Sequence, residues 1–287
     1  MQSWFIFSLF SIFVLAGAEI SQKVSLSQKV NVSAITNNFY IWTLQGTVGI
    51  ILAILLGQFS LALDTSSIIK LVLIGFIYFA GGTLYYTSYK GSSASISLIL
   101  MSISVVISST LGTILLGDVF TAGKIVGIIL ILLAIVFLNL NSKEKINRYN
   151  VFAMLGGVCF GVAFTIDKSF VSTLSPFMYL GLLCLTVALV SLILKLKLII
   201  KETKTLAKKN FIPMIFASSF GSAFNLFTFF AYKNGANVGV ADAMNNSSVF
   251  LVILAEVLFL KDRTNLKRKI ISATMAILGI ILIGVVK

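Results

Sequence analysis

The sequence has no histidine, only two prolines and two cysteines, and only nine acidic residues in a chain of 287. The lack of histidine excludes imidazole metal sites, proton relays and general bases. Charged residues make up 11% of the chain and hydrophobic residues 58%, whereas a soluble domain has about 25% charged residues. The composition therefore indicates a protein that crosses a membrane several times.

The apolar residues form long continuous runs, and this pattern favours membrane helices. A transmembrane β-barrel would instead show alternating segments of about 10 residues. The two cysteines, Cys159 and Cys184, both lie inside apolar runs. We interpret them as small buried hydrophobic residues and not as a disulfide.

Catalytic and nucleotide-binding motifs are missing. The sequence contains no H-E-x-x-H, G-x-S-x-G, C-x-x-C or Walker A pattern, so we expect neither an enzyme nor a chain that uses ATP itself, and no metal or cofactor. The net charge of +13 comes mostly from lysines and arginines at the ends of apolar runs. In that position they act as topology determinants, and no nucleic-acid partner is expected.

Ten runs approach the roughly 17–25 apolar residues that a spanning helix needs. They cover residues 4–20, 39–56, 71–86, 96–116, 125–140, 151–166, 177–194, 211–232, 238–260 and 270–286. The first run has an alternative interpretation as a cleaved leader, because residues 16–18 are small. Its matching run at 151–166, and the lack of lysine and arginine before residue 4, favour a permanent helix.

The chain repeats itself. Residues 89–91 (Tyr-Lys-Gly) correspond to 232–234 (Tyr-Lys-Asn), and residues 22–23 (Gln-Lys) correspond to 167–168 (Asp-Lys). We therefore predict an all-α integral membrane protein with a five-helix repeat at 1–140, a linker at 141–150 and a second repeat at 151–287. An odd number of helices inverts the second repeat, and inverted repeats are a recurrent transporter architecture.

Lysine and arginine positions bear on orientation. Seventeen of the 22 lie in connections on one side of the predicted membrane and five on the other. The positive-inside rule would make the basic side cytoplasmic and place both termini outside. Six of these lysines lie in residues 195–210, which we expect to form an amphipathic segment at the lipid headgroups.

The ninth predicted helix carries the polar residues Asp242, Asn245, Asn246 and Glu256 on one helical face. A charge at bilayer depth costs about 2.5–3.5 kcal/mol, so such residues usually face a cavity. Asp242 and Glu256 are separated by about 21 Å along a helix and cannot hold the same small ligand. The alternative is that each extends towards its own end of the membrane or pairs with a nearby lysine.

Other candidate site residues lie on other helices. Asn225 is set among small residues, and Tyr85 and Phe229 precede the two Tyr-Lys pairs, where they line a cavity or anchor at the membrane interface. Desolvation favours the neutral form of a carboxyl group, which makes Glu19, Asp242 and Glu256 candidates for proton coupling. Asn225, Asp242, Asn245, Asn246, Tyr85 and Phe229 are the substrate-binding candidates.

The sequence resembles the EamA branch of the drug/metabolite transporter superfamily over nearly its whole length. The resemblance is carried by the Tyr-Lys pairs at 89–90 and 232–233, each followed by a polar helix and then by Leu-Gly-Asp at 116–118 or Leu-Lys-Asp at 260–262. The prolines that are common in the fourth and ninth helices of the family are absent here. The resemblance implies cytoplasmic termini, in conflict with the charge count, so orientation stays open.

Architecture and resemblance together predict a multi-pass transporter in the cell membrane (plasma or inner membrane). It would move a small metabolite or drug-like compound by alternating access, driven by protons or by exchange. The first, third, fourth, sixth, eighth and ninth helices would line the cavity, and the fifth and tenth would pack together or form a homodimer surface. Alternatives are a carrier for sugars, nucleotide sugars or phosphorylated anions, if Lys90 and Lys233 face the cavity, and a membrane-embedded lipid-handling enzyme.

Overall fold

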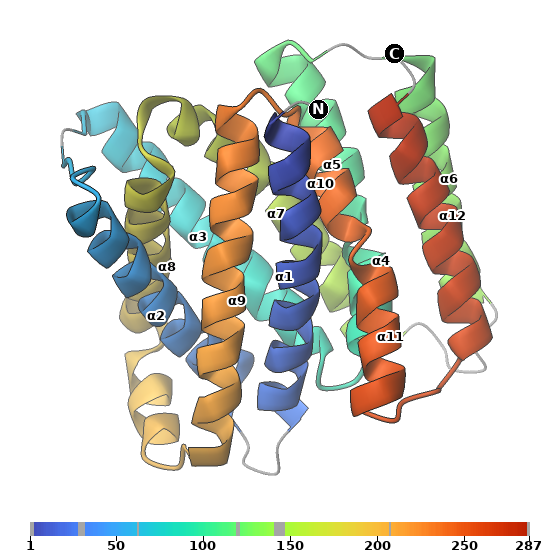
Figure 1. Cartoon of the computed structure of the whole chain (residues 1–287). Helices are drawn as coiled ribbons and strands as arrows, with labels where there is room; N and C mark the ends of the chain where they lie inside the picture. The colour runs from blue at the N-terminus through green and yellow to red at the C-terminus, as the bar shows by residue number, and fades with distance from the viewer. Residues whose placement is uncertain are drawn as a thin grey trace.

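The computed structural model describes residues 3–27, 32–61, 63–118, 121–140, 147–206 and 208–285, and in these ranges the regular structure is entirely helical. The helices are α1 (Ser3–Ser27), α2 (Ala34–Leu55), α3 (Thr65–Ser88), α4 (Ala94–Met101), α5 (Ile103–Leu116), α6 (Ala122–Leu140), α7 (Arg148–Thr173), α8 (Pro176–Thr203), α9 (Lys208–Lys233), α10 (Val238–Asn246), α11 (Val249–Phe259) and α12 (Leu266–Val285). Figure 1 shows them as one bundle.

Two of the ten predicted helices contain a tight turn in the middle, although each still forms one candidate span, Ala94–Leu116 and Val238–Phe259. The run at 96–116 divides into α4 and α5 at Ser102, and the run at 238–260 divides into α10 and α11 at Ser247 and Ser248. At each break the backbone amides bond three residues back, as Ser102 N does to Ile99 O (3.2 Å) and Ser248 N to Asn245 O (3.0 Å). Such a tight turn changes the direction of the side chains beyond it.

The two broken helices count as one crossing each, so the bundle has the ten predicted crossings. Among the described residues, eight of these are long and apolar enough to span a membrane by length and composition. The other two are α6 and α12, and α12 begins with the basic residues Lys267, Arg268 and Lys269. These two helices pack against each other at one side of the bundle (Figure 1).

Helix starts follow the capping chemistry of the sequence. The side chains of Ser33, Ser93 and Ser175 each accept a bond from the backbone amide three residues later, at the starts of α2, α4 and α8. These bonds satisfy amides that the first turn of a helix leaves without partners. Asp64 and Asn147 cap α3 and α7 in a similar way. Because these polar caps precede the apolar residues, α2, α3 and α7 start three to six residues before the apolar runs that predicted them.

The two halves of the chain run in opposite directions. Lys23, near the end of α1, bonds to the carbonyl oxygen of Ser92 (2.6 Å), and the Ser92 hydroxyl bonds to Asn150 at the start of α7 (2.8 Å). The first helix of one half therefore ends where the first helix of the other half begins. The largest contacts between the halves also come in matching pairs: α1 with α9, α3 with α7, and α2 with α8.

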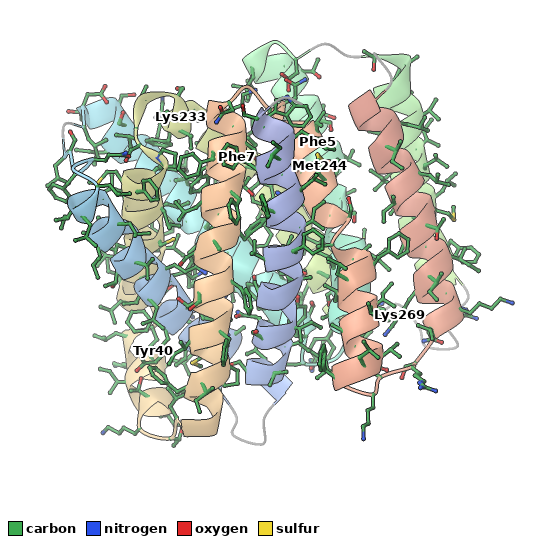
Figure 2. All side chains as sticks on the ribbon, viewed as in Figure 1. Phe5, Phe7, Tyr40, Lys233, Met244 and Lys269 are labelled. Atoms are coloured by element: carbon green, nitrogen blue, oxygen red, sulfur yellow. The ribbon has the colours of Figure 1, made fainter. Side chains whose placement is uncertain are left out.

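The outer surface is apolar and the interior holds many polar residues. Phe13, Leu55, Ile193 and Phe259 are each more than 60% exposed, whereas residues such as Glu19, Asp167 and Asp242 are buried. Figure 2 shows the side chains that cover the outside of the bundle. This distribution suits a protein whose outer surface contacts lipid.

Most described residues of the basic segment at 195–210 are exposed, and the segment extends the helices on either side of it. Helix α8 continues to Thr203 after a kink at Lys195 (φ −135°, ψ 26°), and α9 already begins at Lys208. Glu202 accepts bonds from the backbone nitrogen (3.0 Å) and the hydroxyl (2.6 Å) of Ser33 at the start of α2. These bonds tie the extension to the bundle.

Glycines allow the closest helix contact near the broken helix of the first half. A Cβ atom on Gly157 would lie 2.6 Å from the carbonyl oxygen of Met101, and one on Gly161 would lie 2.7 Å from that of Ser104. The pair of glycines four residues apart therefore lets α7 pack directly on the backbone at the α4–α5 break.

Candidate functional site

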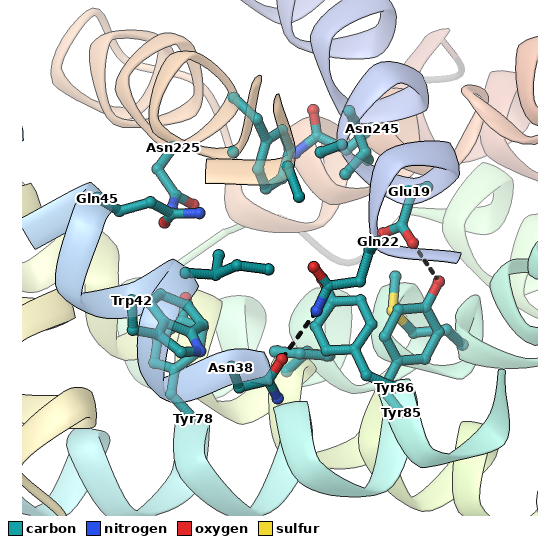
Figure 3. A pocket seen from close by; sticks show the side chains of 18 of the residues that line it. Glu19, Gln22, Asn38, Trp42, Gln45, Tyr78, Tyr85, Tyr86, Asn225 and Asn245 are labelled. Carbon is teal, nitrogen blue, oxygen red and sulfur yellow. Dashed lines mark hydrogen bonds between the residues drawn. The ribbon is translucent and has the colours of Figure 1, made fainter. Parts of the chain in front are cut away.

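A cavity lies in the middle of the bundle, between the two halves (Figure 3). Its volume is about 70 Å³, which is room for several water molecules. The lining residues come from α1, α2, α3, α4, α7, α9 and α10: Leu15, Ala18, Glu19, Gln22, Asn38, Ile41, Trp42, Gln45, Tyr78, Tyr85, Tyr86, Met101, Phe160, Phe164, Ala217, Gly221, Phe224, Asn225, Asp242, Asn245 and Asn246.

Two pairs of amide side chains bridge helices across this cavity. Gln22 on α1 donates to Asn38 on α2 (2.8 Å), and Asn225 on α9 donates to Gln45 on α2 (3.1 Å). Figure 3 shows both pairs pointing towards the cavity. Each side-chain amide has donors and an acceptor beyond the one that the bridge uses, so these pairs can also bond a polar ligand.

Glu19 brings a carboxyl group from α1 to the cavity. The side chain is 2% exposed, and its Oε2 accepts bonds from the hydroxyls of Tyr85 (3.2 Å) and Tyr89 on α3. The hydroxyl oxygens of Tyr85 and Tyr89 lie 3.0 Å apart, so the two side chains approach Glu19 together. The carboxyl group is therefore oriented by two tyrosines of the same half of the chain.

Asp242 brings a second carboxyl group from α10. It is 0% exposed, and it accepts bonds from Ser108 (2.8 Å) and Ser104 (3.2 Å) on α5 and from the Asn246 amide (2.8 Å). The Ser102 hydroxyl in turn donates to Asn246 (3.2 Å). The serines of the first broken helix thus hold the polar residues of the second.

Asn245 connects three helices beside the same cavity. Its side-chain oxygen accepts a bond from Ser11 on α1 (2.5 Å), and its amide donates to Thr228 on α9 (3.3 Å). The candidates Asn225, Asp242, Asn245, Asn246, Tyr85 and Glu19 therefore all line one cavity.

Aromatic rings form a continuous wall along another part of the cavity. The ring centres of Trp42 and Tyr78 are 5.5 Å apart, and those of Tyr78 and Phe160 are 5.8 Å apart. Phe160 also contacts Tyr85 (5.8 Å) and stacks on Phe164 (5.9 Å). The described lining combines two carboxyl groups, six amide side chains and seven aromatic side chains.

Two candidates lie elsewhere. Phe229 is buried beside Tyr179, with ring centres 5.0 Å apart, and does not line the cavity. Glu256 lies beyond the α10–α11 break, where its carboxylate pairs with Lys269 of α12 (3.1 Å) and accepts a bond from the Ser95 amide (3.2 Å). Glu256 therefore faces the same α4–α5 crossing as Asp242, but it lies beside the start of α4 and does not line the cavity.

The sequence analysis missed the contribution of α2, which places Asn38, Trp42 and Gln45 at the cavity. Gln45 lies within an apolar helix and was detectable by the signal that identified Asn246, an amide at bilayer depth. Asn38 was assigned to a loop because the predicted helix began one residue later. Gln22 appeared only as a repeat marker.

Another buried carboxyl group, Asp167 on α7, bonds to Tyr78 of the cavity wall and is a further residue that the sequence did not single out for the site. It accepts bonds from Tyr78 (2.5 Å) and Tyr179 (2.6 Å). Among the described residues, no group of three or more histidines, cysteines and acids is placed to hold a metal ion. The chemistry available at the site is therefore recognition by hydrogen bonds, charge and aromatic faces.

Comparison with protein families gives two matches to the EamA-like transporter family, over residues 2–140 and 147–285. The chain belongs to this family. The two matches are the two repeats of the fold, and together they cover nearly the whole EamA-like chain.

One solved structure, titled "Crystal structure of protein", has a TM-score of 0.72 with this EamA-like chain at 14% sequence identity. The alignment covers 98% of this chain and 96% of the other. At that identity the likeness concerns the fold alone. No curated protein matches the sequence.

Proposed function

We propose that this protein is a secondary transporter that moves a small metabolite or drug-like compound across the cell membrane, a plasma or inner membrane, by alternating access. The cavity carries this proposal, because residues of both repeats line it and its polar groups are buried among largely apolar helices. In inverted-repeat transporters the substrate site lies where the repeats meet. The residues 1–140 and 151–287 would be the two moving halves, joined by 141–150.

Alternating access requires the halves to separate at one end of the cavity at a time. At the end where α11 meets α4, Glu256 of the second half accepts two bonds from Ser95 of the first half, from its amide (3.2 Å) and its hydroxyl. Opening at that end would break this contact. The contact therefore stabilises the conformation in which this end is closed.

Glu19 and Asp242 are the proton-coupling residues in this proposal. Each is buried without a counter-charge among the described ion pairs, which makes a charged carboxylate costly. The hydroxyl partners of Glu19, and the hydroxyl and amide partners of Asp242, offset part of that cost. Glu19 faces Tyr85, Tyr86 and Tyr89 of α3, while Lys23 on its own helix points to backbone carbonyls of Tyr89 and Ser92.

Asp242 faces the serines of α5, and Tyr232 of α9 is the other titratable group near it. Glu256 differs because Lys269 supplies a counter-charge. Uphill transport by a variant that combines Glu19→Gln, Asp242→Asn and Glu256→Gln would contradict proton coupling at these groups.

The two alternative functions find less support. The anion carrier relied on Lys90 and Lys233, but both side chains are exposed and neither lines the cavity; Figure 2 shows Lys233 at one end of the bundle. A lipid-handling enzyme would need a nucleophile or metal set at the level of the headgroups. The polar groups of the cavity include no cysteine or histidine, and they are buried between the helices of the bundle.

The outer face of α6 and α12 is the proposed homodimer surface. It exposes Ile125, Ile129 and Leu133 on α6 and Leu278 and Ile281 on α12. Crosslinking in native membranes between single cysteines placed on this face would support a dimer, whereas monomers alone would leave lipid as its neighbour.

A thermal-shift screen of the detergent-purified protein against amino acids, amines, sugars, nucleotides and lipids tests the function. A ligand that binds the folded state raises its apparent stability as RT ln(1 + [L]/Kd). We expect a hit that is lost in Asn225→Ala, in the cavity, and retained in Asn234→Ala, which changes an exposed asparagine. A hit retained in both variants would place binding outside the cavity.

A further inference from the structure

The charge of the cavity lining identifies a substrate class. Resting on the proposed function, we propose that the cavity binds an organic cation, an amine or quaternary ammonium attached to an aromatic or apolar body, with the cationic nitrogen at Glu19. Three features of the lining support this proposal: its charges, its aromatic faces and its amide pairs.

The described lining has two carboxyl groups, Glu19 and Asp242, and no lysine or arginine. The ion pairs found among the described residues involve the other acids Asp118, Glu256 and Asp262. Burying a carboxylate without a counter-charge is costly, and a cation that enters the cavity would supply one. A bound anion would instead add like charge to the same site.

Glu19 is better placed than Asp242 to hold this cation. Both tyrosine bonds to Glu19 reach the same oxygen, Oε2, whereas the three bonds to Asp242 occupy both of its oxygens. A carboxylate offers about four lone-pair sites, so Glu19 keeps acceptor capacity for an N–H donor. Figure 3 shows Glu19 beside Tyr85 and Tyr86 at one side of the cavity.

The aromatic wall suits both parts of such a ligand. The faces of Tyr85, Tyr86 and Trp42 carry negative charge density that attracts a cation within about 6 Å of the ring centre. Phe160, Phe164 and Tyr78 continue the wall and offer apolar area for the body of the ligand. A site of this composition selects by charge first and by shape second.

The amide pairs set the limits of the ligand. Gln22 with Asn38, and Gln45 with Asn225, are neutral groups that donate and accept hydrogen bonds. They would bond a hydroxyl or carbonyl group on the ligand without changing the charge preference. The predicted class therefore includes amines with one or two polar substituents.

Three probes with the same phenyl body test the charge: benzylamine, benzyl alcohol and benzoate, which are cationic, neutral and anionic near neutral pH. Thermal shift of the purified wild-type protein should give Kd values at least about tenfold lower for benzylamine than for the other two, because the cation gains attraction to Glu19 and the rings. The Glu19→Gln variant should lose at least about tenfold in benzylamine affinity. The control variant Asp64→Asn removes an exposed carboxylate at the start of α3 that does not line the cavity, and it should leave the affinity for benzylamine unchanged.

Fluorescence supplies a second readout that reports the place of binding. Trp4 and Trp42 are the two tryptophans of the chain, and Trp42 lines the cavity. In a Trp4→Phe background, benzylamine should change the emission of Trp42 with the same Kd as in the thermal shift. If Glu19→Gln fails to fold, the emission of Trp42 in the Trp4→Phe background will show it. The comparison of the three probes uses wild-type Glu19, so it tests the proposal even if that variant unfolds.

The proposal is overturned if benzoate binds as tightly as benzylamine, if Glu19→Gln binds benzylamine unchanged, or if none of the three probes binds. These results are distinguishable from failure of the proposed function. A metabolite hit that Asn225→Ala abolishes would keep the transporter proposal and reject only the cation, whereas the absence of any hit that depends on the cavity would count against both.

Discussion

The two ends of the bundle contain equivalent backbone positions with very different side chains. At the end of α5, Asp118 N bonds to Gly112 O (3.2 Å), and at the end of α11, Asp262 N bonds to Glu256 O (3.1 Å). At the next helix starts, Ile125 N bonds to Thr121 O and Lys269 N to Asn265 O. The matching bonds show that Gly112 corresponds to Glu256 and Ile125 to Lys269.

The side chains at these equivalent positions make one end polar and the other apolar. Glu256, Lys269 and Ser95 form a network in which each residue is at most 1% exposed. Ser93 caps the start of α4 and Asn237 caps the start of α10, so these two residues are equivalent. Two residues further along, Ser95 therefore corresponds to Gly239. The other end therefore has glycine, isoleucine and glycine in place of the acid, the base and the hydroxyl.

This difference shows how a duplicated fold can become asymmetric in function while the backbone is preserved. One end has a buried ion pair within the second half, between Glu256 and Lys269, and hydrogen bonds from Ser95 of the first half to Glu256. At the other end, the described ion pair is between Lys168 and Asp118, which are 4.0 Å apart with Lys168 23% exposed. The two ends should therefore respond very differently to loss of a lysine.

The largest expected effect is that of Lys269→Leu. The change leaves the Glu256 carboxylate buried without its cation, and breaking a buried pair in this way costs about 3–5 kcal/mol. Thermal unfolding in detergent should show a large loss of stability. Lys168→Leu at the opposite end is the matched control and should cost less than about 1 kcal/mol, because that pair is longer and partly solvated.

Removing both partners sharpens the same comparison. A Glu256→Leu and Lys269→Leu double variant should recover most of the stability that Lys269→Leu loses, because no uncompensated buried charge remains. A double-mutant cycle measures the coupling between the two residues. A double variant as unstable as the sum of its single variants would show that the pair does not act as a unit.

Ser95→Ala should have an intermediate effect. It removes the hydroxyl bond to Glu256 but keeps the bond from the backbone amide, and a hydrogen bond to a charged group contributes about 1.5–3 kcal/mol. Because the contact joins the halves, we also expect faster hydrogen exchange at the start of α4. Exchange unchanged there, with stability unchanged, would contradict a role in holding this end closed.

The smallest expected effect concerns Asp262, in the connection between α11 and α12. Partial burial favours a higher pKa, but bonds from Thr264 and the nearby Lys269 ammonium outweigh it and lower the pKa of Asp262 below its usual 3.8. A lowered pKa in the folded state stabilises the protein above the unfolded pKa, and this stabilisation is lost as the pH falls through the folded pKa.

Asp262→Asn should therefore cost less than about 1 kcal/mol near neutral pH, after allowance for solvent screening. The difference between variant and wild type should be full above the unfolded pKa of about 3.9 and should shrink as the pH falls through the lower pKa of the folded carboxylate. Melting temperatures of the two proteins between pH 3 and pH 7 measure this. A difference as large at pH 3 as at pH 7 would contradict the electrostatic origin.

Much of this fold was predictable, because lipid requires long apolar helices and the charges mark their ends. The breaks at Ser102 and Ser248 were not, since serine is compatible with a continuous helix and the tight turns depend on packing against α7 and neighbouring helices. Asp242 and Glu256 nevertheless both face the α4–α5 crossing, through bonds to Ser108 and Ser95. The pairing of Glu256 with Lys269 depends on how α11 and α12 meet, which no local pattern contains.

The cavity was predictable in part. Buried polar residues within apolar helices pointed to Asn225, Asp242, Asn245 and Asn246, and all four line it. The α2 residues and the amide pairs depended on contacts between helices far apart in the sequence. The repeats also differ at the cavity. The alignment that matches Gln22 with Asp167 matches Glu19 with Phe164, so a carboxyl group in the first repeat corresponds to an aromatic ring in the second.

A counterflow assay in proteoliposomes tests the central claim, that the cavity carries a substrate across the membrane. Vesicles loaded with the tightest-binding ligand of the thermal-shift screen receive a trace of the same ligand in labelled form outside. The account predicts that label accumulates transiently inside, that Asn225→Ala abolishes the accumulation and that Asn234→Ala does not. A ligand that binds in the cavity but never exchanges its label would contradict transport.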